Sequence, residues 1–569
     1  MALDPVTYAL VSQALIAIGR EMGAKLVRSA YSSIIRESRD AAAALLDRHG
    51  HVVAQAELIP MHLSAMAETF APCAARYPIG SLREGDFYIT NDPYHGGQHL
   101  PDVYIFSPIF FEGALVGFAG STAHHLDLGG GSPGLNATAE DVYQEGLIFP
   151  PARYAYARDW LDGPLRDMVA ANIRVPERTI GDFDAQFAAN SVGVARVVEL
   201  CRKYGAEPVM AAMAELQDYA ERRLRAAIRQ VPDGVYRGRD AADDDGLGDA
   251  PLVIEATVTV AGDSITIDFA GSCGQSRRNV NSPLSSTLAA AQSCVKSVLT
   301  GADVPFNDGT KRPITVKAPY GSILNPRPPA PVRARMVSSY RAYNAAMRAL
   351  AEAVPERVAA GGYDTTTAVC LSHLGPAGYR VTIEVYGGGL GASAVADGCD
   401  AVDGPLSNCS NTPVEAQDME VDHFRIVEYA LVPDSCGHGR FRGGLGIRRT
   451  YEVLKDDVTL SIYADRFRTT PGGLFGGTAG RPARCEVRRG GEVIPVRSKD
   501  SVALRKGDLL VVTTGGGAGY GDPAMRPPRA VAEDVAQGYV SADAAAAVYG
   551  DASAAAGSPA TSAKAGRNP

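Results

Sequence analysis

Apolar side chains near the N-terminus recur at the spacing of one helix face. They fall three to five positions apart, directly after Asp4 and Pro5, which suit the cap and the first turn of a helix. We therefore predict a long helix over residues 4–33. Its apolar stripe is expected to pack in the core; the stripe consists of Val6, Leu10, Leu15, Ile18, Met22 and Leu26.

The pattern changes to strand-like runs after Asp40. The runs 41–46 and 51–56 flank Asp47-Arg48-His49-Gly50, which predicts a hairpin. A second hairpin is predicted around Ala261-Gly262-Asp263, between residues 253–260 and 264–269. Helical spacing predicts further helices at about 62–75, 182–204, 208–231, 283–300 and 337–353. From about residue 420 the chain is rich in strands and in glycine-rich turns.

These elements predict an α+β fold with several domains. We expect a domain at 1–231, with the long helix, the hairpins that carry the candidate chemistry and a helical extension. An α+β middle domain at 232–420 and a β-rich domain at 421–525 follow. Residues 526–569 are expected to form a short helical segment and a disordered tail, because the chain from Ala552 onward is rich in Ala, Ser and Gly.

Composition excludes several classes of protein. The chain has 569 residues, 46% of them hydrophobic, and a formal net charge of -9. A mildly acidic chain without a basic stripe does not suit nucleic acid. No apolar run reaches the length of about 20 residues that a membrane span needs. The nine cysteines form no CxxC pair, so we expect reduced thiols in a cytoplasmic protein. The N-terminus has no basic stretch before an apolar run, so no signal peptide is predicted.

The segment from Asn91 to Asp102 concentrates metal-binding side chains. It contains His95, His99 and two aspartates within a Gly- and Pro-rich stretch, which predicts a shaped loop rather than a helix. A second cluster contains His124, His125 and Asp127. Histidine and aspartate together offer the mixed nitrogen and oxygen ligands that suit Zn, Mn or Fe.

A predicted hairpin brings the two clusters together. Residues 103–110 and 115–122 are apolar runs joined by a short turn around Glu112 and Gly113. Pairing about that turn places Asp102 opposite Ala123, and His124 opposite Pro101. Facing residues lie about 5 Å apart. His99, Asp102 and His124 are therefore expected to converge and to leave open metal positions for water or substrate.

Other residues are candidates for the same site. Asp40, at the start of the first hairpin, is a candidate fourth ligand, although the sequence does not place it beside the others. Asp127 suits a carboxylate that orients a ligand histidine. His62 could line the pocket or simply begin a helix. His95 and His125 are expected to support the site or the fold rather than to bind metal, and histidines in Gly-rich loops often bond only the backbone.

No nucleotide site is visible in the sequence. The glycine runs 387–389, 443–444 and 515–517 match neither a phosphate-binding loop nor a dinucleotide fingerprint. We predict that they form tight β-turns. No serine nucleophile elbow is present either.

These residues carry a family resemblance. The stretches from Ile35 to Asp40, from Asn91 to Asp102 and from His124 to Gly130 resemble the hydantoinase B family. The likeness covers about residues 4–550. That family includes subunits of ATP-dependent hydantoinases, 5-oxoprolinase, caprolactamase, and acetone and acetophenone carboxylases. The resemblance implies a Zn, Mn or Fe ion held by His99, Asp102 and His124, with Asp40 as the fourth ligand.

The resemblance also implies a division of labour between two subunits. A partner, the hydantoinase A-type ATPase, would use ATP to phosphorylate the oxygen of the substrate, and this chain would bind no ATP. We expect opening of a cyclic amide (a hydantoin, 5-oxoproline or a lactam) in a hetero-oligomer, with Asp40, Asp127 and His62 as catalytic residues and Asp40 acting as ligand or general base. The alternatives are a component of an ATP-dependent ketone carboxylase and a non-catalytic scaffold with a structural metal.

Overall fold

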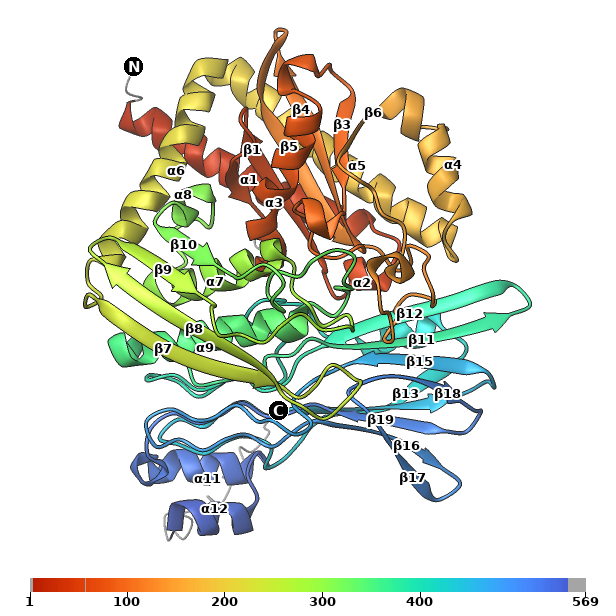
Figure 1. The fold of residues 1–569 in the computed structure, drawn as a ribbon, viewed down its shortest axis with the longest axis vertical. Helices are drawn as coiled ribbons and strands as arrows, with labels where there is room; N and C mark the ends of the chain where they lie inside the picture. Colours follow the sequence, from red (N-terminus) through yellow and green to blue (C-terminus); the bar gives the residue numbers. More distant parts are fainter. Residues whose placement is uncertain (1–3, 57, 551–569) are drawn as a thin grey trace, which may run out of the picture.

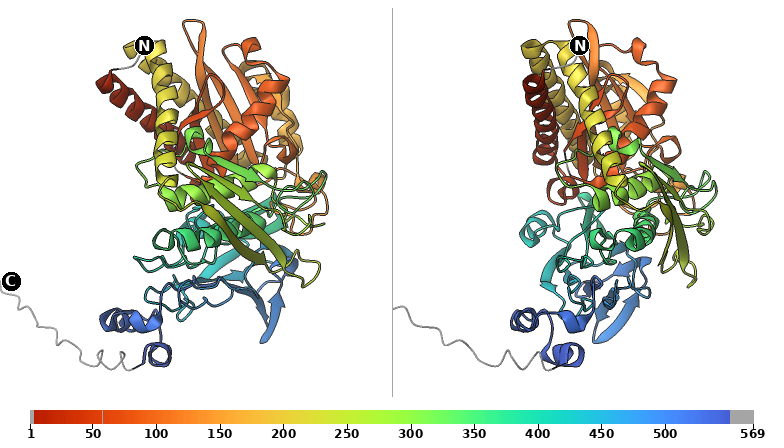
Figure 2. Two further views of the ribbon diagram at one scale, coloured as in Figure 1. Left: turned by 60° about the vertical axis from the view of Figure 1, so that its left-hand side comes forward. Right: turned by 90° about the vertical axis from the view of Figure 1, so that its left-hand side faces the viewer.

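The computed structural model describes residues 4–56 and 58–550, which form an α+β fold (Figure 1). Four β-sheets follow one another along the molecule. Figure 2 shows the N-terminal sheet and helices at one end and the C-terminal helices at the other. The predicted fold class is confirmed.

The N-terminal sheet is antiparallel and has the strand order β2-β1-β5-β4-β3-β6. Its strands are β1 (Ala41–Asp47), β2 (Val52–Gln55), β3 (Asp86–Thr90), β4 (Asp102–Phe111), β5 (Ala114–His124) and β6 (Ala152–Ala155). Helices α1 (Pro5–Ser29), α5 (Pro176–Tyr204) and α6 (Ala206–Ile228) lie on one side, and α3 (Pro60–Arg76) lies on the other.

Both faces of this sheet are buried, as the alternation along β1 shows. Ala43 and Leu45 pack in the cluster that contains α1. Leu46, which points the other way, packs in the cluster that contains Phe70 of α3. Successive side chains of a strand point to opposite faces, so a sheet covered on both sides needs a continuous apolar run rather than an alternating one. The first predicted hairpin is confirmed.

The first helix differs in part from its prediction. Asp4 caps it as expected, accepting hydrogen bonds from the backbone N–H groups of Val6 and Thr7 at 3.1 and 3.0 Å. The helix ends at Ser29, and a separate short helix, α2 (Ser33–Arg36), follows. The predicted stripe is buried from Leu15 onward, whereas Val6 is 68% exposed and Leu10 is 53% exposed. Tyr8 and Val11 of the first two turns pack in the core, so Val6 and Leu10 lie on a different face of the helix from the buried stripe.

The middle of the chain forms a second sheet with the strand order β10-β9-β8-β7. The predicted hairpin around residues 261–263 is confirmed as β8 and β9. Helices α7 and α9 agree with two predicted helices and pack in the same core as this sheet. The elements are β7 (Gly234–Ala242), β8 (Leu252–Ala261), β9 (Ser264–Asp268), β10 (Ile314–Lys317), α7 (Leu284–Leu299) and α9 (Met336–Ala353).

Two further sheets pack face to face in the C-terminal half. Their strand orders are β12-β11-β15-β18 and β13-β14-β19-β16-β17, and one apolar cluster lies between them. The strands are β11 (Thr367–Gly375), β12 (Gly378–Tyr386), β13 (Phe424–Leu431), β14 (Ile447–Val453), β15 (Val458–Tyr463), β16 (Arg484–Arg489), β17 (Glu492–Val496), β18 (Lys499–Leu504) and β19 (Leu509–Thr513).

The first of these sheets takes strands from both sides of residue 420, where the sequence predicted a domain boundary. Strand β11 pairs directly with β15, so residues 367–386 belong to the same sheet as residues 458–463. Two α-helices follow the last strand, where the sequence predicts a short helical segment, and the expected disordered tail lies outside the described residues. The remaining helices are α4 (Pro164–Ala171), α8 (Asp308–Lys311), α10 (Val414–Glu420), α11 (Pro528–Ala536) and α12 (Ala542–Tyr549).

The glycine runs form a packed layer of extended segments, so the predicted β-turns are wrong. Gly389 donates its N–H to Gly515 O at 3.1 Å, and Gly517 donates to Gly444 O at 2.9 Å. A Cβ atom on Gly389 would lie 1.9 Å from Gly444 O, and one on Gly444 would lie 1.9 Å from Cys399 O. Glycine is needed here because neighbouring backbones touch where a side chain would be, not because a turn requires a positive φ.

Within residues 4–56 and 58–550, no helix is both long enough and apolar enough to cross a bilayer.

The glycine layer leads to a stability prediction. Gly444→Ala should destabilise the protein by about 3 kcal/mol or more, because the new methyl group collides with backbone atoms, which cannot move aside as a side chain can. Gly80→Ala is the matched control, since a Cβ atom there meets no atom within 4 Å. Thermal unfolding followed by circular dichroism checks both, and equal melting temperatures would contradict the packing described.

Candidate metal centre

Three adjacent strands of the N-terminal sheet each have one terminus at the same end of the sheet, and these termini carry the central residues of the site. Strand β5 lies between β1 and β4, and its last residue is His124. On one side His124 pairs with Asp102, the first residue of β4. On the other side the His124 N–H donates to Asp40 O at 3.0 Å. The pairing of β1 with β5, which the sequence did not show, therefore places Asp40 in the site.

The observed hairpin register differs by one residue from the prediction. Asp102 lies opposite His124 rather than opposite Ala123. The cause is a bulge: Phe111 still faces Ala114 near the turn, but the register shifts between Ile109 and Phe110. A bulge inserts one extra residue into one strand. The shift makes Asp102 and His124 direct cross-strand neighbours.

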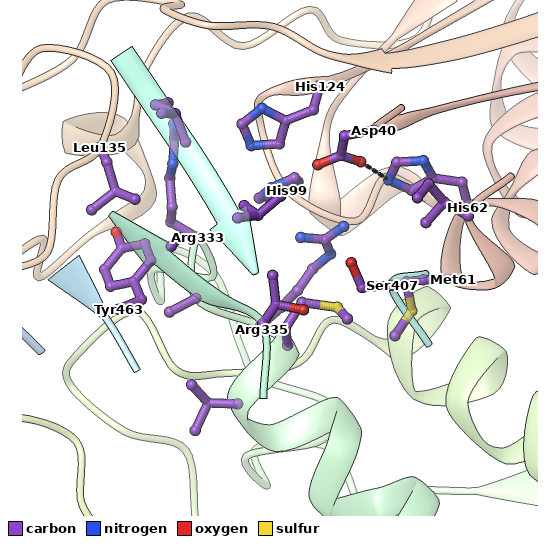
Figure 3. A pocket seen from close by; sticks show the side chains of 18 residues that line it. Asp40, Met61, His62, His99, His124, Leu135, Arg333, Arg335, Ser407 and Tyr463 are labelled. Atoms are coloured by element: carbon purple, nitrogen blue, oxygen red, sulfur yellow. Dashed lines mark ion pairs between the residues drawn. The ribbon is translucent and has the colours of Figure 1, made fainter. Parts of the chain in front are cut away.

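The loop before β4 is held in place by side-chain amides. Asn91 donates to Leu100 O at 2.7 Å and accepts from the Phe149 N–H at 2.7 Å. Gln98 donates to Met61 O at 2.9 Å, which ties the loop to the first turn of α3. His99 in the loop and His62 on the helix are thereby brought to the same cavity, where Figure 3 shows both.

The carboxylate of Asp102 is the hub of the cluster. Its Oδ2 lies 2.8 Å from His99 Nδ1, 3.1 Å from His62 Nε2 and 2.7 Å from Arg335 Nη2. Asp102 is fully buried. Asp40 Oδ1 lies 3.8 Å from His62 Nε2. Ligand atoms of Asp40, His62 and Asp102 all lie within 4.8 Å of one another.

The electrostatics favour neutral imidazoles beside a charged carboxylate. Burial lowers the pKa of His99 to about 3, with Arg335 adding to the effect. Burial and His99 hold the pKa of His124 well below its usual value. Burial would raise the pKa of Asp102, but His62, His99 and Arg335 outweigh it and hold that pKa well below the usual value. Neutral imidazole and ionised carboxylate are the forms that bind metals.

Asp40 differs from Asp102 in its charge state. Burial raises the pKa of Asp40 to about 6, although the His62 imidazole opposes the rise. A carboxyl group with such a pKa exchanges its proton near neutral pH, which suits a general base.

Several buried polar atoms around the cluster have no hydrogen-bond partner in the described part of the chain. They include His62 Nδ1, His99 Nδ1, His124 Nδ1 and Asp102 Oδ1. Buried polar atoms without a partner are uncommon because they lose their hydration without replacement. Unsatisfied nitrogen and oxygen donors around a shared cavity fit a divalent metal such as Zn, Mn or Fe.

Of the four residues predicted to bind metal, Asp40, His99 and His124 line one cavity, and Asp102 contacts His99. Among the described residues, the group whose ligand atoms lie close enough to share an ion is Asp40, His62 and Asp102. The role of the four predicted residues as ligands stays a prediction. For His62, both interpretations apply, because it lies in the first turn of α3 and also lines the cavity.

Asp127 is placed differently from its prediction. Its carboxylate accepts from the Gly134 N–H at 3.0 Å and from the backbone N–H and the side chain of Arg174 at 2.7 and 3.1 Å. Asp127 therefore holds its own loop, and the predicted orientation of a ligand histidine is corrected. That contact is made instead by Asp102 with His99.

The two histidines expected to be supporting residues lie away from the cluster of ligands. His95 is on the surface, with Nδ1 2.8 Å from Asp92 Oδ2. His125 Nε2 lies 2.9 Å from Gln186 Oε1, and its ring stacks on Phe183 with centroids 4.0 Å apart. Both contacts stabilise the local fold.

A cavity of about 60 Å³ adjoins the cluster and contains residues that sequence reasoning missed. Arg333 and Arg335 come from the loop before α9, and the only sequence signal is the Arg-Ala-Arg string before a predicted helix. The hydroxyl of Thr366 donates to Asp403 Oδ1 at 3.1 Å, and burial raises the pKa of Asp403 to about 7. Apolar residues form the other wall: Leu135, Ala368, Ile383 and Val385.

Comparison with known proteins gives consistent similarities. A family model described as Hydantoinase B/oxoprolinase matches residues 4–523. The chain is 34% identical to a Pseudomonas protein named as a candidate B component of a D-/L-hydantoinase, covering 96% of this chain and 95% of the relative. It is 31% identical to the beta component of the caprolactamase of Pseudomonas jessenii, covering 96% of each chain.

Solved structures agree with these similarities. The crystal structure of the ATP-dependent caprolactamase from Pseudomonas jessenii superposes with a TM-score of 0.89 at 29% identity, covering 97% of this chain and 96% of that chain. The nucleotide-free structure of acetone carboxylase superposes with a TM-score of 0.85, covering 97% of this chain and 82% of that chain. At 20% identity, the second likeness shows a shared fold.

The role of Asp102 as a hub leads to a stability prediction. In metal-free protein, Asp102→Asn should lower the free energy of unfolding by about 3–5 kcal/mol, because it leaves the buried Arg335 cation without its partner. Asp92→Asn, which breaks an ion pair with an exposed histidine, should cost less than about 1 kcal/mol. Urea denaturation measures both, and similar losses in the two variants would contradict the assignment.

Proposed function

The chain belongs to the hydantoinase B/oxoprolinase family, and from that membership we propose that it is the metal-binding catalytic subunit of an ATP-dependent hydrolase that opens a cyclic amide. The substrate class is a hydantoin, 5-oxoproline or a lactam. The observation that carries the proposal is the convergence of Asp40, His99, Asp102 and His124 beside a small cavity.

Three of these residues face the cavity: Asp40, His99 and His124. They would hold a divalent Zn, Mn or Fe ion, and Asp102 could add its unpartnered Oδ1 while its Oδ2 orients His99. A carboxylate that contacts the second nitrogen of a ligand histidine fixes the ring orientation. When bound, such an ion acts as a Lewis acid and lowers the pKa of water from about 16 towards about 7.

The protein groups supply the proton transfer. Asp40 would either bind the ion or, where it stays outside the ligand shell with its pKa raised to about 6, accept a proton from the attacking water near neutral pH. His62, 3.8 Å from Asp40 Oδ1, is placed to stabilise the carboxylate form. The apolar wall opposite excludes bulk water, which strengthens these interactions.

A partner would supply activation of the amide. An amide carbonyl is a poor electrophile, and phosphorylation of its oxygen makes a good leaving group. This sequence has no phosphate-binding loop, and two relatives are named as single components of larger enzymes, a B component and a beta component. We therefore assign ATP use to a separate A-type ATPase subunit, joined to this chain in a hetero-oligomer.

The two alternative functions have less support. The likeness to acetone carboxylase concerns the fold alone, so it does not favour carboxylation over hydrolysis. A purely structural metal would need a closed ligand shell, whereas three of the four candidate ligands face a cavity.

The ligand assignment predicts loss of metal. His99→Ala and His124→Ala should each lose most bound metal and reduce activity by at least about 100-fold, because a ligand is missing. His95→Ala is the control, since His95 is exposed and pairs with Asp92 on the surface. This variant should keep its bound metal and its activity. Metal analysis of the purified proteins, alongside circular dichroism to establish folding, is the measurement. Full occupancy in either ligand variant would refute the assignment.

Activation by a partner predicts that the isolated chain is inactive. Ring opening of hydantoin, 5-oxoproline and caprolactam, followed by chromatography, should be undetectable with or without ATP. It should start when the A-type subunit and ATP are added together. Ring opening by the chain alone would identify a self-sufficient hydrolase, and consumption of bicarbonate with ATP would identify a carboxylase.

A further inference from the structure

Two buried arginines line the cavity beside the candidate metal ligands. Arg333 is 6% exposed and Arg335 is 4% exposed. Both contribute to the cavity wall with His99 and His124. Removing a guanidinium from water is costly unless it is paired, so the partners of each arginine show what the cavity is built to receive.

Arg335 uses only part of its hydrogen-bonding capacity. Its Nη2 donates to Asp102 Oδ2 at 2.7 Å. Its Nε is buried without a hydrogen-bond partner among the described residues. Figure 3 shows the side chain reaching from the α9 loop toward Asp40 and His99. This cavity-lining arginine therefore has one N–H donor with no acceptor among the described residues.

Arg333 has no carboxylate partner within ion-pair distance in the described part of the chain. Its guanidinium donates to two backbone carbonyls, Gly134 O and Glu145 O. The Glu145 carboxylate is instead occupied by the backbone N–H groups of Val332 and Arg333, at 3.0 and 2.8 Å. These bonds fix the loop and leave the Arg333 cation without an ionic partner beside the cavity.

Other features of the cavity also favour an anion at this end. The first residues of the 18-residue helix α9, Met336 and Val337, line the cavity, and a helix N-terminus carries partial positive charge. A bound divalent ion would add more. The opposite wall is aliphatic, with Leu135, Ile383 and Val385. The lining of the cavity therefore suits an anionic group beside apolar atoms.

We propose that Arg333 and Arg335 form an oxyanion-binding subsite that holds the anionic group of the substrate. This inference rests on the proposed function and adds the specificity-determining residues. The guanidinium fork matches phosphate and carboxylate oxygens, so the anion is either the phosphoryl group of an activated ring or a substrate carboxylate. In either case the arginines position the ring against the aliphatic wall.

Calorimetric titration of the isolated, nucleotide-free chain tests the subsite. Inorganic phosphate and acetate are titrated separately into zinc-loaded protein. Tighter binding of phosphate identifies the phosphoryl group as the natural anion, and tighter binding of acetate identifies the carboxylate. Binding of neither anion overturns the proposal.

Substitution of Arg333 shows whether the affinity for the anion comes from the arginines or from the bound zinc. Arg333→Gln should weaken binding of the preferred anion by at least about tenfold, the loss of a charge-assisted hydrogen bond. Arg333→Lys keeps the charge but loses the planar guanidinium fork, so its affinity for the anion should lie between those of the wild type and Arg333→Gln. Arg327→Gln is the matched control, because Arg327 lies in the same loop but is exposed, and its affinity should not change. Unchanged affinity in Arg333→Gln overturns the proposal.

A second measurement covers failure of Arg333→Gln to fold. The melting temperature of the wild-type chain should rise with phosphate or acetate, compared with sodium chloride at equal ionic strength, because a bound ligand stabilises the native state. No rise with either anion overturns the subsite. Neither the titration nor the melting experiment needs ATP, a partner or turnover. A negative result in them would therefore leave the hydrolase proposal standing. Conversely, absence of ring opening would leave the anion subsite standing.

Discussion

The buried carboxylate of Asp102 joins parts of the chain that are far apart in sequence. It contacts His62 of α3, His99 of the preceding loop and Arg335 of the loop before α9. A buried charge is tolerated only when it is paired and hydrogen-bonded, so these groups must assemble together or not at all. The arrangement of the ligands depends on this one ionised group. Its own position is fixed by strand pairing, because Asp102 begins β4 opposite His124.

The site therefore lies between the predicted domains rather than inside one. The N-terminal sheet supplies the candidate ligands, the α9 loop supplies the two arginines, and β12 and β15 supply Ile383 and Tyr463. The contacts that complete the cavity cross the boundary expected at residue 231. A fragment of the chain that ends there would keep all four candidate metal ligands but would lose the two arginines and most of the aliphatic wall.

Local patterns in the sequence predicted the elements well, and non-local pairings account for what they missed. Apolar runs on either side of Glu112 were sufficient to predict the β4–β5 hairpin and to bring His99, Asp102 and His124 together. The bulge near Ile109 has no clear signature in a run of apolar residues, so the register was wrong by one. Asp40 and Arg335 reach the site through pairing and packing over long sequence separations, which periodicity does not encode. The glycine runs form close backbone contacts rather than the predicted turns, and their sequence cannot separate the two because glycine permits both.

The glycine layer also bears on the order in which a newly made chain can reach its native state. Its segments come from Gly361 to Gly519: Ala518 donates to Gly361 O at 2.9 Å, Gly437 to Gly517 O at 2.7 Å and Gly517 to Gly444 O at 2.9 Å. Domains generally fold as they leave the ribosome, from the N-terminus onward. This layer cannot be completed in that order, because Gly361, Gly389, Gly437 and Gly444 all hydrogen-bond to residues 515–518, which are synthesised last. During translation the N-terminal sheet can form early, whereas closure of the C-terminal half waits for almost the whole chain.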